Sequence, residues 1–488
     1  MPISPVTYRP ATSQLRLALW LCLLSTMIFH SAMAADTPAF LADQVVPMAR
    51  PAGAIKASDV SMRALKKANT DEAIAAGHAF HITRLDWCYS KNAEWITKIK
   101  EQGWSYMGAL INQTKVRLTW RYKADGSWWL VPWFTWVDPK DPSESLPCYN
   151  DPYYERMYVD SAKAFIDQGF SCFHKDDSQG NMDSLGAGCC FCPDCTTKAK
   201  AAGVDLTDKK QMATFQKESV LAFYARTRET LEAYAKQPIT LSGNLDLKGP
   251  IGPAFDWAIQ ECQKDWVVKP SFILDRVQAA RRMGKVQAFT AQHDWGTERF
   301  RIGIATLTSC GSNLIVPWDQ YINMDKKGTR LFAEPKDLAG FYGFIRGIAD
   351  RLDGYELAAV AGFDMAKAKE AKGGVAAVTG ADKVSAWLRV KPKDTKAPLV
   401  IHLTNAATDA GACSLRLRTD ALFAGKAFTA EWLVPAPYDA GAHAAAETAH
   451  DYRRLVVHAV IEPSVDGDAS VFAIAAVQPW GVLVLTPR

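Results

Sequence analysis

Two adjacent carboxylates follow a short apolar run in the first half of the chain. Residues 170–173 are typical of a buried strand, and Asp176 and Asp177 come almost directly after it. In a parallel barrel the C-terminal ends of the strands carry the active-site loops, so the position of these groups matters more than their type. The stretch therefore predicts acid–base or nucleophilic chemistry at the end of a strand.

Three cysteines with metal-ligand spacing lie just beyond the carboxylates. Cys190, Cys192 and Cys195 form a C-x-C-x-x-C pattern, and Cys148 lies 47 positions before the last of them. Four thiolates at such spacing suit a closed, tetrahedral structural zinc site, which leaves no open position for catalysis. The alternative is covalent, with Cys148 bonded to one of the cluster and Cys189 as a spare thiol.

The first residues have the features of a secretory signal. Arg9 and Arg16 precede an apolar run at residues 17–29, and small residues at 32–34 provide a cleavage site, so residues 1–34 are expected to be removed. The apolar core is too short to span a membrane, and no later run is long enough. We therefore expect an exported protein, periplasmic or secreted, that is not membrane-bound after cleavage.

Charge and aromatic content restrict the possible partners. The net charge is +4, or +2 without Arg9 and Arg16, and no dense basic run is present, which argues against nucleic acid. The chain contains 16 tryptophans, many of them between Trp104 and Trp136. Flat aromatic faces suit sugar rings, although tryptophan also fills protein cores. A homo-oligomer is left open.

Strand and helix patterns alternate through the middle of the chain. Predicted strands lie at residues 78–86, 104–112, 129–134, 170–173, 239–245, 255–261, 285–292 and 314–318. The third of these follows an Ala-Asp-Gly hairpin signal, so it is either a barrel strand or part of an insertion. Helical segments lie between most of the strands, which predicts an α/β fold with a (β/α)8 TIM-like barrel.

The chain divides into four predicted parts. The signal peptide (1–34) is followed by a lead-in arm at residues 35–76, and the barrel covers residues 77–353. Beyond it, short apolar runs separated by Gly, Pro and Asp predict a C-terminal, all-β, sandwich-like domain at residues 354–488.

The cysteine pattern resembles the zinc site of family 42 β-galactosidases, which lies on the loop after the fourth barrel strand. The barrel followed by a β domain also resembles that family, and the likeness covers about residues 78–353. The family pattern departs at the carboxylates, because it has an Asn-Glu pair at the fourth strand and a Glu at the seventh. This chain has Asp176-Asp177 and, at the seventh strand, Gln292-His293-Asp294. The resemblance therefore does not transfer that family's catalytic pair.

We assign a different pair of carboxylates from the pair that family 42 uses. A strand-end Asp resembles the nucleophile of several α-glycosidase barrel families, some of which place the acid/base at the sixth strand, where Glu261 lies. We assign Asp176 as nucleophile or stabiliser and Glu261 as acid/base, with a pKa raised by apolar neighbours. Asp177 would face away or bind a hydroxyl group. The alternative is that the aspartates cap a loop and Glu261 is a solvated helix residue.

Other polar residues at predicted strand tips could bind sugar hydroxyls or stack on sugar rings. They are His81, Arg84, Asp86, Asn112, His174, Asn244, His293, Asp294, Trp318 and Asp319, with Asp294 and Asp319 as reserve carboxylates. The sequence thus predicts an exported glycoside hydrolase acting on a poly- or oligosaccharide, with either a structural zinc or a disulfide at the cysteine cluster and no other cofactor. The second hypothesis is a non-catalytic carbohydrate-binding barrel that keeps the aromatic groove without a working carboxylate pair.

Overall fold

A computed structural model describes residues 41–63, 70–131, 137–182, 190–291, 295–316, 334–367, 375–423 and 427–488. The signal segment predicted at residues 1–34 lies outside these ranges. Among the described helices, none has both the length and the apolar character needed to cross a bilayer.

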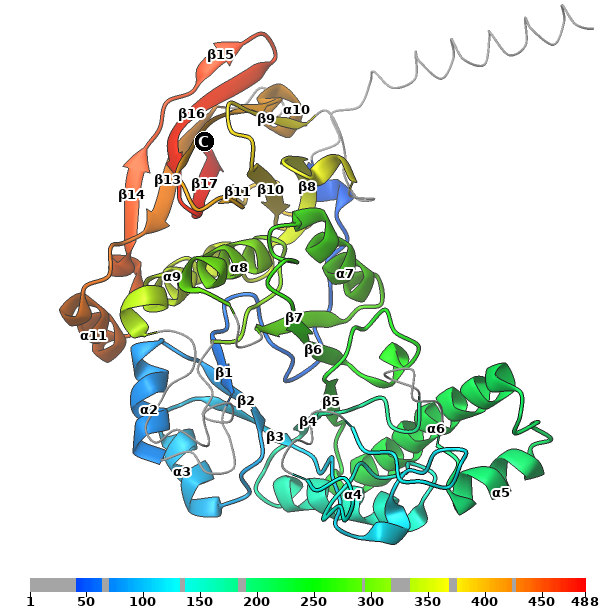
Figure 1. Ribbon diagram of the computed structural model, residues 1–488. Helices are drawn as coiled ribbons and strands as arrows, with labels where there is room; N and C mark the ends of the chain where they lie inside the picture. The colour runs from blue at the N-terminus through cyan, green and yellow to red at the C-terminus, as the bar shows by residue number, and fades with distance from the viewer. Residues whose placement is uncertain are drawn as a thin grey trace, which may run out of the picture.

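A curled parallel sheet forms the centre of the first part of the chain (Figure 1). Its seven strands pair in sequence order: β1 (Ser61–Arg63), β2 (Arg84–Cys88), β3 (Ser105–Ala109), β4 (Cys172–Lys175), β5 (Thr240–Gly243), β6 (Trp257–Cys262) and β7 (Val286–Ala291). The eighth position is filled by an extended segment that bridges both edges, with Leu314 paired to Phe289 and Val316 paired to Met62. The barrel predicted from the strand–helix alternation is therefore confirmed.

Helices cover the outside of the barrel (Figure 1). They are α2 (Thr70–Ala79), α3 (Ala93–Glu101), α4 (Pro152–Ile166), α5 (Pro193–Ala201), α6 (Lys209–Ala235), α7 (Pro270–Arg282), α8 (Thr297–Ser309) and α9 (Pro335–Gly347), with short 3-10 turns at Leu41–Gln44, Arg117–Thr119, Gly252–Ala254 and Ala349–Arg351. Local sequence explains several starts. Before α4, the Asp151 side chain accepts hydrogen bonds from Tyr153 N and Tyr154 N, and Pro152 opens the helix.

The strand count differs from the prediction at two places. β1 lies inside the segment expected to be a lead-in arm, so the strand predicted at residues 78–86 is the second, and it begins only at Arg84. A three-residue strand is too short to show an alternating pattern, which is why it was not predicted. The third barrel strand is β3, and Trp129 instead belongs to an insertion whose hairpin is marked by the Tyr122–Trp128 bridge.

Two antiparallel sheets make up the C-terminal region. The six-stranded sheet runs β14 (Val456–Val460), β13 (Phe428–Pro435), β17 (Trp480–Pro487), β11 (Leu399–Asn405), β10 (Val384–Val390) and β8 (Glu356–Gly362). The four-stranded sheet runs β15 (Ser464–Asp466), β16 (Ala469–Val477), β12 (Gly411–Leu417) and β9 (Ala376–Thr379). Short helices α10 (Thr419–Phe423) and α11 (Ala440–Ala449) and 3-10 turns at Met365–Lys367 and Tyr452–Leu455 complete it. This agrees with the predicted sandwich-like architecture.

The central strands of the six-stranded sheet, β17, β11 and β10, are buried on both faces. One face packs on α8 and α9, where the Phe344 and Trp480 rings meet edge to face with centroids 4.8 Å apart. The other face packs against the four-stranded sheet through a separate apolar cluster that includes Leu403 and Phe472. Because Trp480 belongs to the same apolar cluster as the barrel's outer layer, barrel and sheet share one continuous core.

Candidate active site

Asp176 lies at the barrel mouth, just past the end of β4, and its carboxylate is held on both oxygens. Oδ1 accepts hydrogen bonds from Asn244 Nδ2 at 3.1 Å and Asp177 N at 2.9 Å, and Oδ2 accepts one from Tyr89 OH at 2.6 Å. Burial alone would raise the pKa of Asp176, but the Arg63 guanidinium and the Tyr89 hydrogen bond outweigh it and lower the pKa below its ordinary value. The group is therefore kept ionised and fixed in orientation.

Glu261 enters the same mouth from β6. Trp257 and Ile259 belong to the apolar cluster that fills the barrel, whereas Ala258 and Cys262 belong to the cluster outside the strands. Because side chains alternate along a strand, Glu261 points to the barrel interior at the strand's C-terminal end, where it is exposed to solvent. Although its side chain reaches solvent, the protein atoms that surround its carboxyl at the mouth and the negative charge of Asp176 raise the pKa of Glu261, and Arg63 opposes this shift.

The two carboxyl groups come from strands that are two positions apart in the sheet. Neighbouring strands lie about 4.8 Å apart, so the ends of β4 and β6 are separated by roughly 10 Å. Inward-pointing side chains shorten that gap toward the range of about 5–9.5 Å that glycosidases use for their carboxylate pairs. The architecture is thus compatible with a catalytic pair.

Asp177 is a third carboxyl group in the same cluster. Its backbone is left-handed (φ 47°), a strained conformation for a non-glycine residue that tends to persist at functional sites. Asn112 Nδ2 contacts both carboxylates, at 3.4 Å from Asp176 Oδ2 and 3.3 Å from Asp177 Oδ2. Burial and the charge of Asp176 raise the pKa of Asp177 to about 7, although Lys175 opposes the shift.

His174 forms the floor beneath the carboxylates. The ring is fully buried, its Nδ1 lies 3.1 Å from Ser242 Oγ, and it packs on Trp87 with centroids 4.3 Å apart. Burial lowers the pKa of His174 to about 3, so the ring is neutral at working pH. The Arg63 guanidinium also lies over the Trp87 ring, with its Cζ atom 4.0 Å from the ring centroid.

Three predicted binding residues lie away from the mouth. Arg84 and Asp86 form a buried bidentate ion pair inside the lower barrel, with Nε–Oδ2 and Nη2–Oδ1 distances of 2.7 Å, and Ser61 Oγ also donates to Asp86. His81 precedes β2 and bonds Glu447 and His443 of the C-terminal region, both at 2.7 Å. The strand-tip expectation is wrong for these residues because β2 begins at Arg84 and continues to Cys88.

Four further predicted site residues cannot be placed. His293, Asp294, Trp318 and Asp319 lie outside the described residues and stay predictions. Of the remaining ones, the structure brings Asn112 and Asn244 to Asp176, as expected from their positions after β3 and β5.

Sequence reasoning missed Arg63, Tyr89 and Lys175, which all act on the carboxylates. Arg63 ends the unpredicted β1, and Tyr89 follows directly after β2. Lys175 is buried, donates to Asp176 O at 2.6 Å, and has a pKa lowered by burial to about 8. A strand of three residues carries no periodic signal from which Arg63 could have been found.

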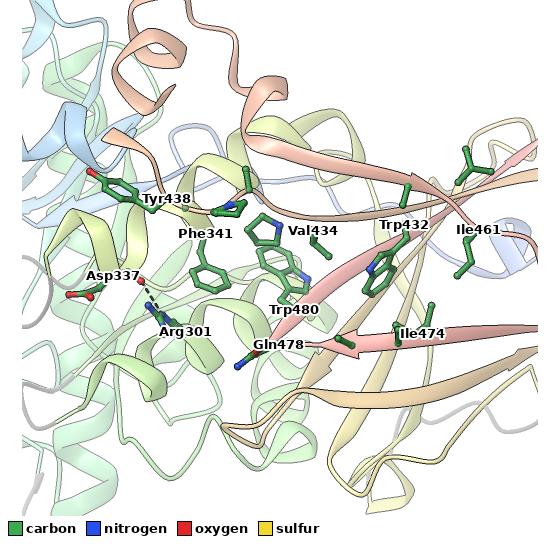
Figure 2. A pocket seen from close by; sticks show the side chains of 18 of the residues that line it. Arg301, Asp337, Phe341, Trp432, Val434, Tyr438, Ile461, Ile474, Gln478 and Trp480 are labelled. Atoms are coloured by element: carbon green, nitrogen blue, oxygen red, sulfur yellow. Dashed lines mark hydrogen bonds between the residues drawn. The ribbon is translucent and has the colours of Figure 1, made fainter. Parts of the chain in front are cut away.

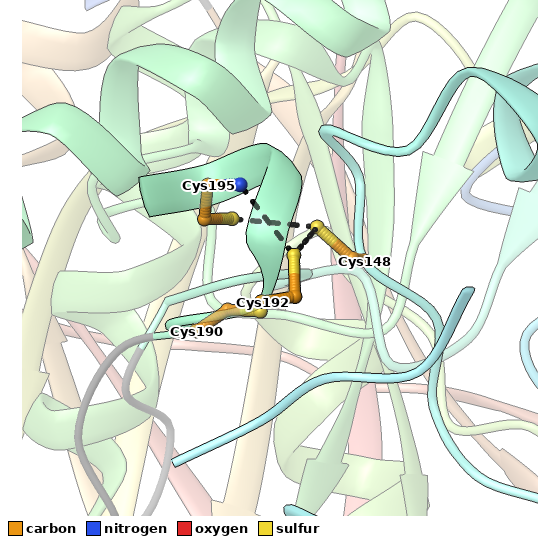
Figure 3. A group of neighbouring side chains, drawn as sticks. All are labelled: Cys148, Cys190, Cys192 and Cys195. Atoms are coloured by element: carbon orange, nitrogen blue, oxygen red, sulfur yellow. Dashed lines mark hydrogen bonds between the residues drawn. The ribbon is translucent and has the colours of Figure 1, made fainter. Parts of the chain in front are cut away.

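The four predicted metal ligands come together in one buried cluster (Figure 3). The sulfur atoms of Cys148, Cys190, Cys192 and Cys195 all lie within 4.8 Å of one another, and Cys148 Sγ is 3.4 Å from Cys195 Sγ and 3.3 Å from Cys192 Sγ. All cysteines of the described residues are free thiols. With Zn–S bonds of about 2.3 Å, a tetrahedral zinc requires sulfurs roughly 3.8 Å apart, so the cluster fits such an ion.

Amide donors around the sulfurs match a set of thiolates. Asn150 N approaches Cys148 Sγ at 3.3 Å, Asn150 Nδ2 approaches Cys195 Sγ at 3.3 Å, and Asn181 Nδ2 approaches the same sulfur at 3.6 Å. Asn181 Oδ1 also accepts from Tyr149 N at 2.8 Å, and Tyr149 OH lies 3.4 Å from Asp177 O. The cluster is thereby connected to the loop that carries the carboxylates.

Comparisons with known proteins find likeness in fold only. No protein-family model matches the chain, and no curated protein matches its sequence. Among solved structures, an α-L-fucosidase isoenzyme 2 from Paenibacillus thiaminolyticus has a TM-score of 0.54 at 8% identity, covering 89% of this chain and 100% of that chain. The chain therefore shares the overall fold of that structure, while the resemblance of its cysteine pattern and domain layout to family 42 stays a prediction.

Two further solved structures have lower TM-scores. The isomaltulose synthase SmuA from Protaminobacter rubrum has a TM-score of 0.49 at 11% identity, covering 88% of this chain and 99% of that chain. The glycoside hydrolase domain of PelA from Pseudomonas aeruginosa has a TM-score of 0.32 at 10% identity, covering 56% of this chain and 99% of that chain.

Proposed function

We propose that this protein is an exported glycoside hydrolase that cleaves a poly- or oligosaccharide with Asp176 and Glu261. The observation that carries the proposal is the opposite shift of two carboxyl pKa values at one barrel mouth, Asp176 lowered and Glu261 raised. Glycosidases separate their two carboxyl groups in this way, so that one is ionised while the other carries a proton. The fold likeness to a fucosidase supports the same class of reaction.

Each carboxyl group then has a defined step. Glu261 donates its proton to the glycosidic oxygen as the bond to the anomeric carbon breaks, and Asp176 attacks that carbon or stabilises its positive charge. If Asp176 attacks, Glu261 returns as the base that takes a proton from the incoming water. Asn244 and Tyr89 hold the Asp176 carboxylate in the orientation that this step requires.

Three variants test the carboxylate assignment. Asp176→Asn and Glu261→Gln should each lower hydrolysis of a responsive polysaccharide by at least about a thousandfold, because each removes an essential proton or charge. Glu218→Gln, at an exposed position of α6, is the matched control and should keep full activity. Product analysis over a polysaccharide panel provides the readout.

Full activity in either site variant would contradict the assignment. If the wild-type protein binds a polysaccharide but releases no product from it, the carbohydrate-binding alternative holds instead. Circular dichroism of each variant separates loss of activity from loss of fold.

We further propose that Cys148, Cys190, Cys192 and Cys195 hold a structural zinc ion that stabilises the loops behind the carboxylates. Metal analysis should find about one zinc per chain, and Cys192→Ser should lower the melting temperature by several degrees, because ligand loss removes folding free energy. Cys413→Ser, buried in the C-terminal region, is the matched control without an effect on zinc content. Protein without metal and with oxidised thiols would exclude the site.

A further inference from the structure

β14 is an outer strand of the six-stranded sheet, and its free edge lies on the surface (Figure 1). Four of its five residues are exposed although most are apolar, with Val457 44% and Val460 78% exposed. Natural proteins usually protect such an edge with lysine, proline, a bulge or a covering helix. β14, with the sequence VVHAV, contains neither lysine nor proline.

Backbone bonding shows which groups the free edge offers. Ile461 N donates to Ala430 O, and Ala436 N donates to Leu455 O, so the odd-numbered residues of this segment face β13. The N–H and C=O groups of the even-numbered His458 and Val460 therefore point outward. Within the described part of the chain, no hydrogen bond is made by these outward groups.

The charges at the two ends of the strand are opposite. Arg453 and Arg454 precede β14 in the 3-10 turn Tyr452–Leu455, where Arg454 is ion-paired with Asp451, and Glu462 follows the strand; all three are exposed. Arg454 lies four residues before His458 and Glu462 four residues after it. An antiparallel pairing centred on His458 would therefore bring the arginine-bearing turn of one copy near Glu462 of the partner subunit.

We propose that β14 pairs with β14 of a second copy of this chain, antiparallel and about a two-fold axis at His458. The two His458 residues then exchange N–H···O bonds, and Val460 N donates to Val456 O of the partner subunit. The turn that carries Arg454 then lies near Glu462 of the partner subunit, and these opposite charges favour this orientation over the parallel one. A two-fold interface of this kind is closed, because each copy uses the same surface.

An apolar groove continues this surface (Figure 2). It has a volume of about 620 Å³, and Trp432, Ile474 and Ala459 contribute to its lining. Ala459 stands directly opposite Trp432 in the sheet, so both side chains lie on the same face. Val457 of the partner subunit would lie opposite Ala459 on that face and extend the apolar wall.

The molecular mass in solution tests the proposal. The full-length mature chain should be a dimer by analytical ultracentrifugation at micromolar concentrations, and His458→Pro should make it monomeric. The N–H that this change removes points outward, so the ladder to β13 is kept. His458→Ala, which retains the N–H, is the matched control and should remain dimeric.

A charge exchange tests the register. Glu462→Arg and Arg454→Glu should each weaken dimerisation by about tenfold, and the double exchange should restore it, because opposite charges then face each other again. A wild-type protein that stays monomeric at about 100 µM, or a dimer unaffected by His458→Pro, would overturn the proposal. So would a double exchange that stays as weak as the single changes. Hydrolytic activity should not change in these variants, since the barrel mouth is not involved.

Discussion

At the scale of single residues, protonation decides which carboxyl group can react. The proposed hydrolysis requires Asp176 to be ionised and Glu261 to be protonated, and their pKa values are shifted in the directions that widen the pH range in which both conditions hold. Activity should therefore follow a bell-shaped pH profile, with an acid limb below about 3.9 and an alkaline limb above about 4.3, the ordinary Asp and Glu values. Initial rates across pH with a neutral substrate provide the measurement.

The group responsible for each limb of the pH profile can be identified by changing the substrate. Activity is lost as pH falls through the Asp176 pKa, because the nucleophile takes a proton, and lost as pH rises through the Glu261 pKa, because the acid loses one. An activated substrate whose leaving group needs no protonation should remove the alkaline limb alone. A profile that keeps both limbs with that substrate would contradict the role of Glu261.

Tyr89 is predicted to act through Asp176 rather than on the substrate. Its hydroxyl donates to Asp176 Oδ2 at 2.6 Å, so Tyr89→Phe removes a hydrogen bond that favours the ionised form. Loss of about 1 kcal/mol corresponds to roughly 0.7 pKa units, and the acid limb should move upward by that amount. Tyr153→Phe, at an exposed tyrosine, is the control, and an unmoved acid limb in Tyr89→Phe would contradict this role.

The sequence predicted the position of a site residue correctly where it also predicted correctly the end of the strand before that residue. Asn112 and Asn244 follow strands whose positions were clear from the sequence, and both reach Asp176. Arg84 and Asp86 were placed at a tip because β2 was expected to end there, although a left-handed residue, Trp87, carries the strand past them. Such a local irregularity has no periodic signal in the sequence.

At the scale of elements, a histidine–glutamate cluster joins α2 to α11. Glu447 bonds His78 Nδ1 at 2.9 Å and His81 Nδ1 at 2.7 Å, and His81 Nε2 lies 2.7 Å from His443 Nδ1. Burial and the neighbouring His81 lower the pKa of His443 to about 4. The hydrogen bonds from the two histidines outweigh burial and keep the pKa of Glu447 low.

Within this cluster His443 should make stability fall at acidic pH, whereas His78, whose pKa is raised by its hydrogen bond to Glu447, acts in the opposite sense. Between the ordinary histidine value of about 6.5 and the folded value of about 4, the unfolded chain binds a proton at His443 that the folded chain does not. The free energy of unfolding should therefore drop over this window, by roughly 1–2 kcal/mol from this residue. Denaturant unfolding at pH 7, 5.5 and 4.5 measures it.

His443→Phe keeps a ring next to His81 but cannot titrate. Its stability should depend less on pH over the same window, even if it is lower at pH 7 because the bond to His81 is lost. His450→Phe, at an exposed position, is the control. An unchanged slope in His443→Phe would show that other groups carry the pH dependence.

At the scale of the whole molecule, alternation of strands and helices was enough to predict the barrel and the change to an all-β region. It could not predict how the two parts meet, because the contact joins residues far apart in the chain, such as Phe344 and Trp480. For the same reason the sequence could not show how the barrel closes. Closure depends on single bridges from Leu314 and Val316 rather than on a full strand.

A shared core predicts that the two parts unfold together. Trp480 is 1% exposed, packs on Phe344, and donates through Nε1 to His402 Nδ1 at 3.2 Å. Trp480→Ala should destabilise the protein by about 3–5 kcal/mol and lower a single calorimetric transition as a whole, because one cavity opens between barrel and sheet. Trp432→Ala, at the half-buried groove, should cost less. Two separate transitions in the wild-type protein, with only the later-melting one moved by Trp480→Ala, would show that the barrel and the C-terminal sheets are independent folding units.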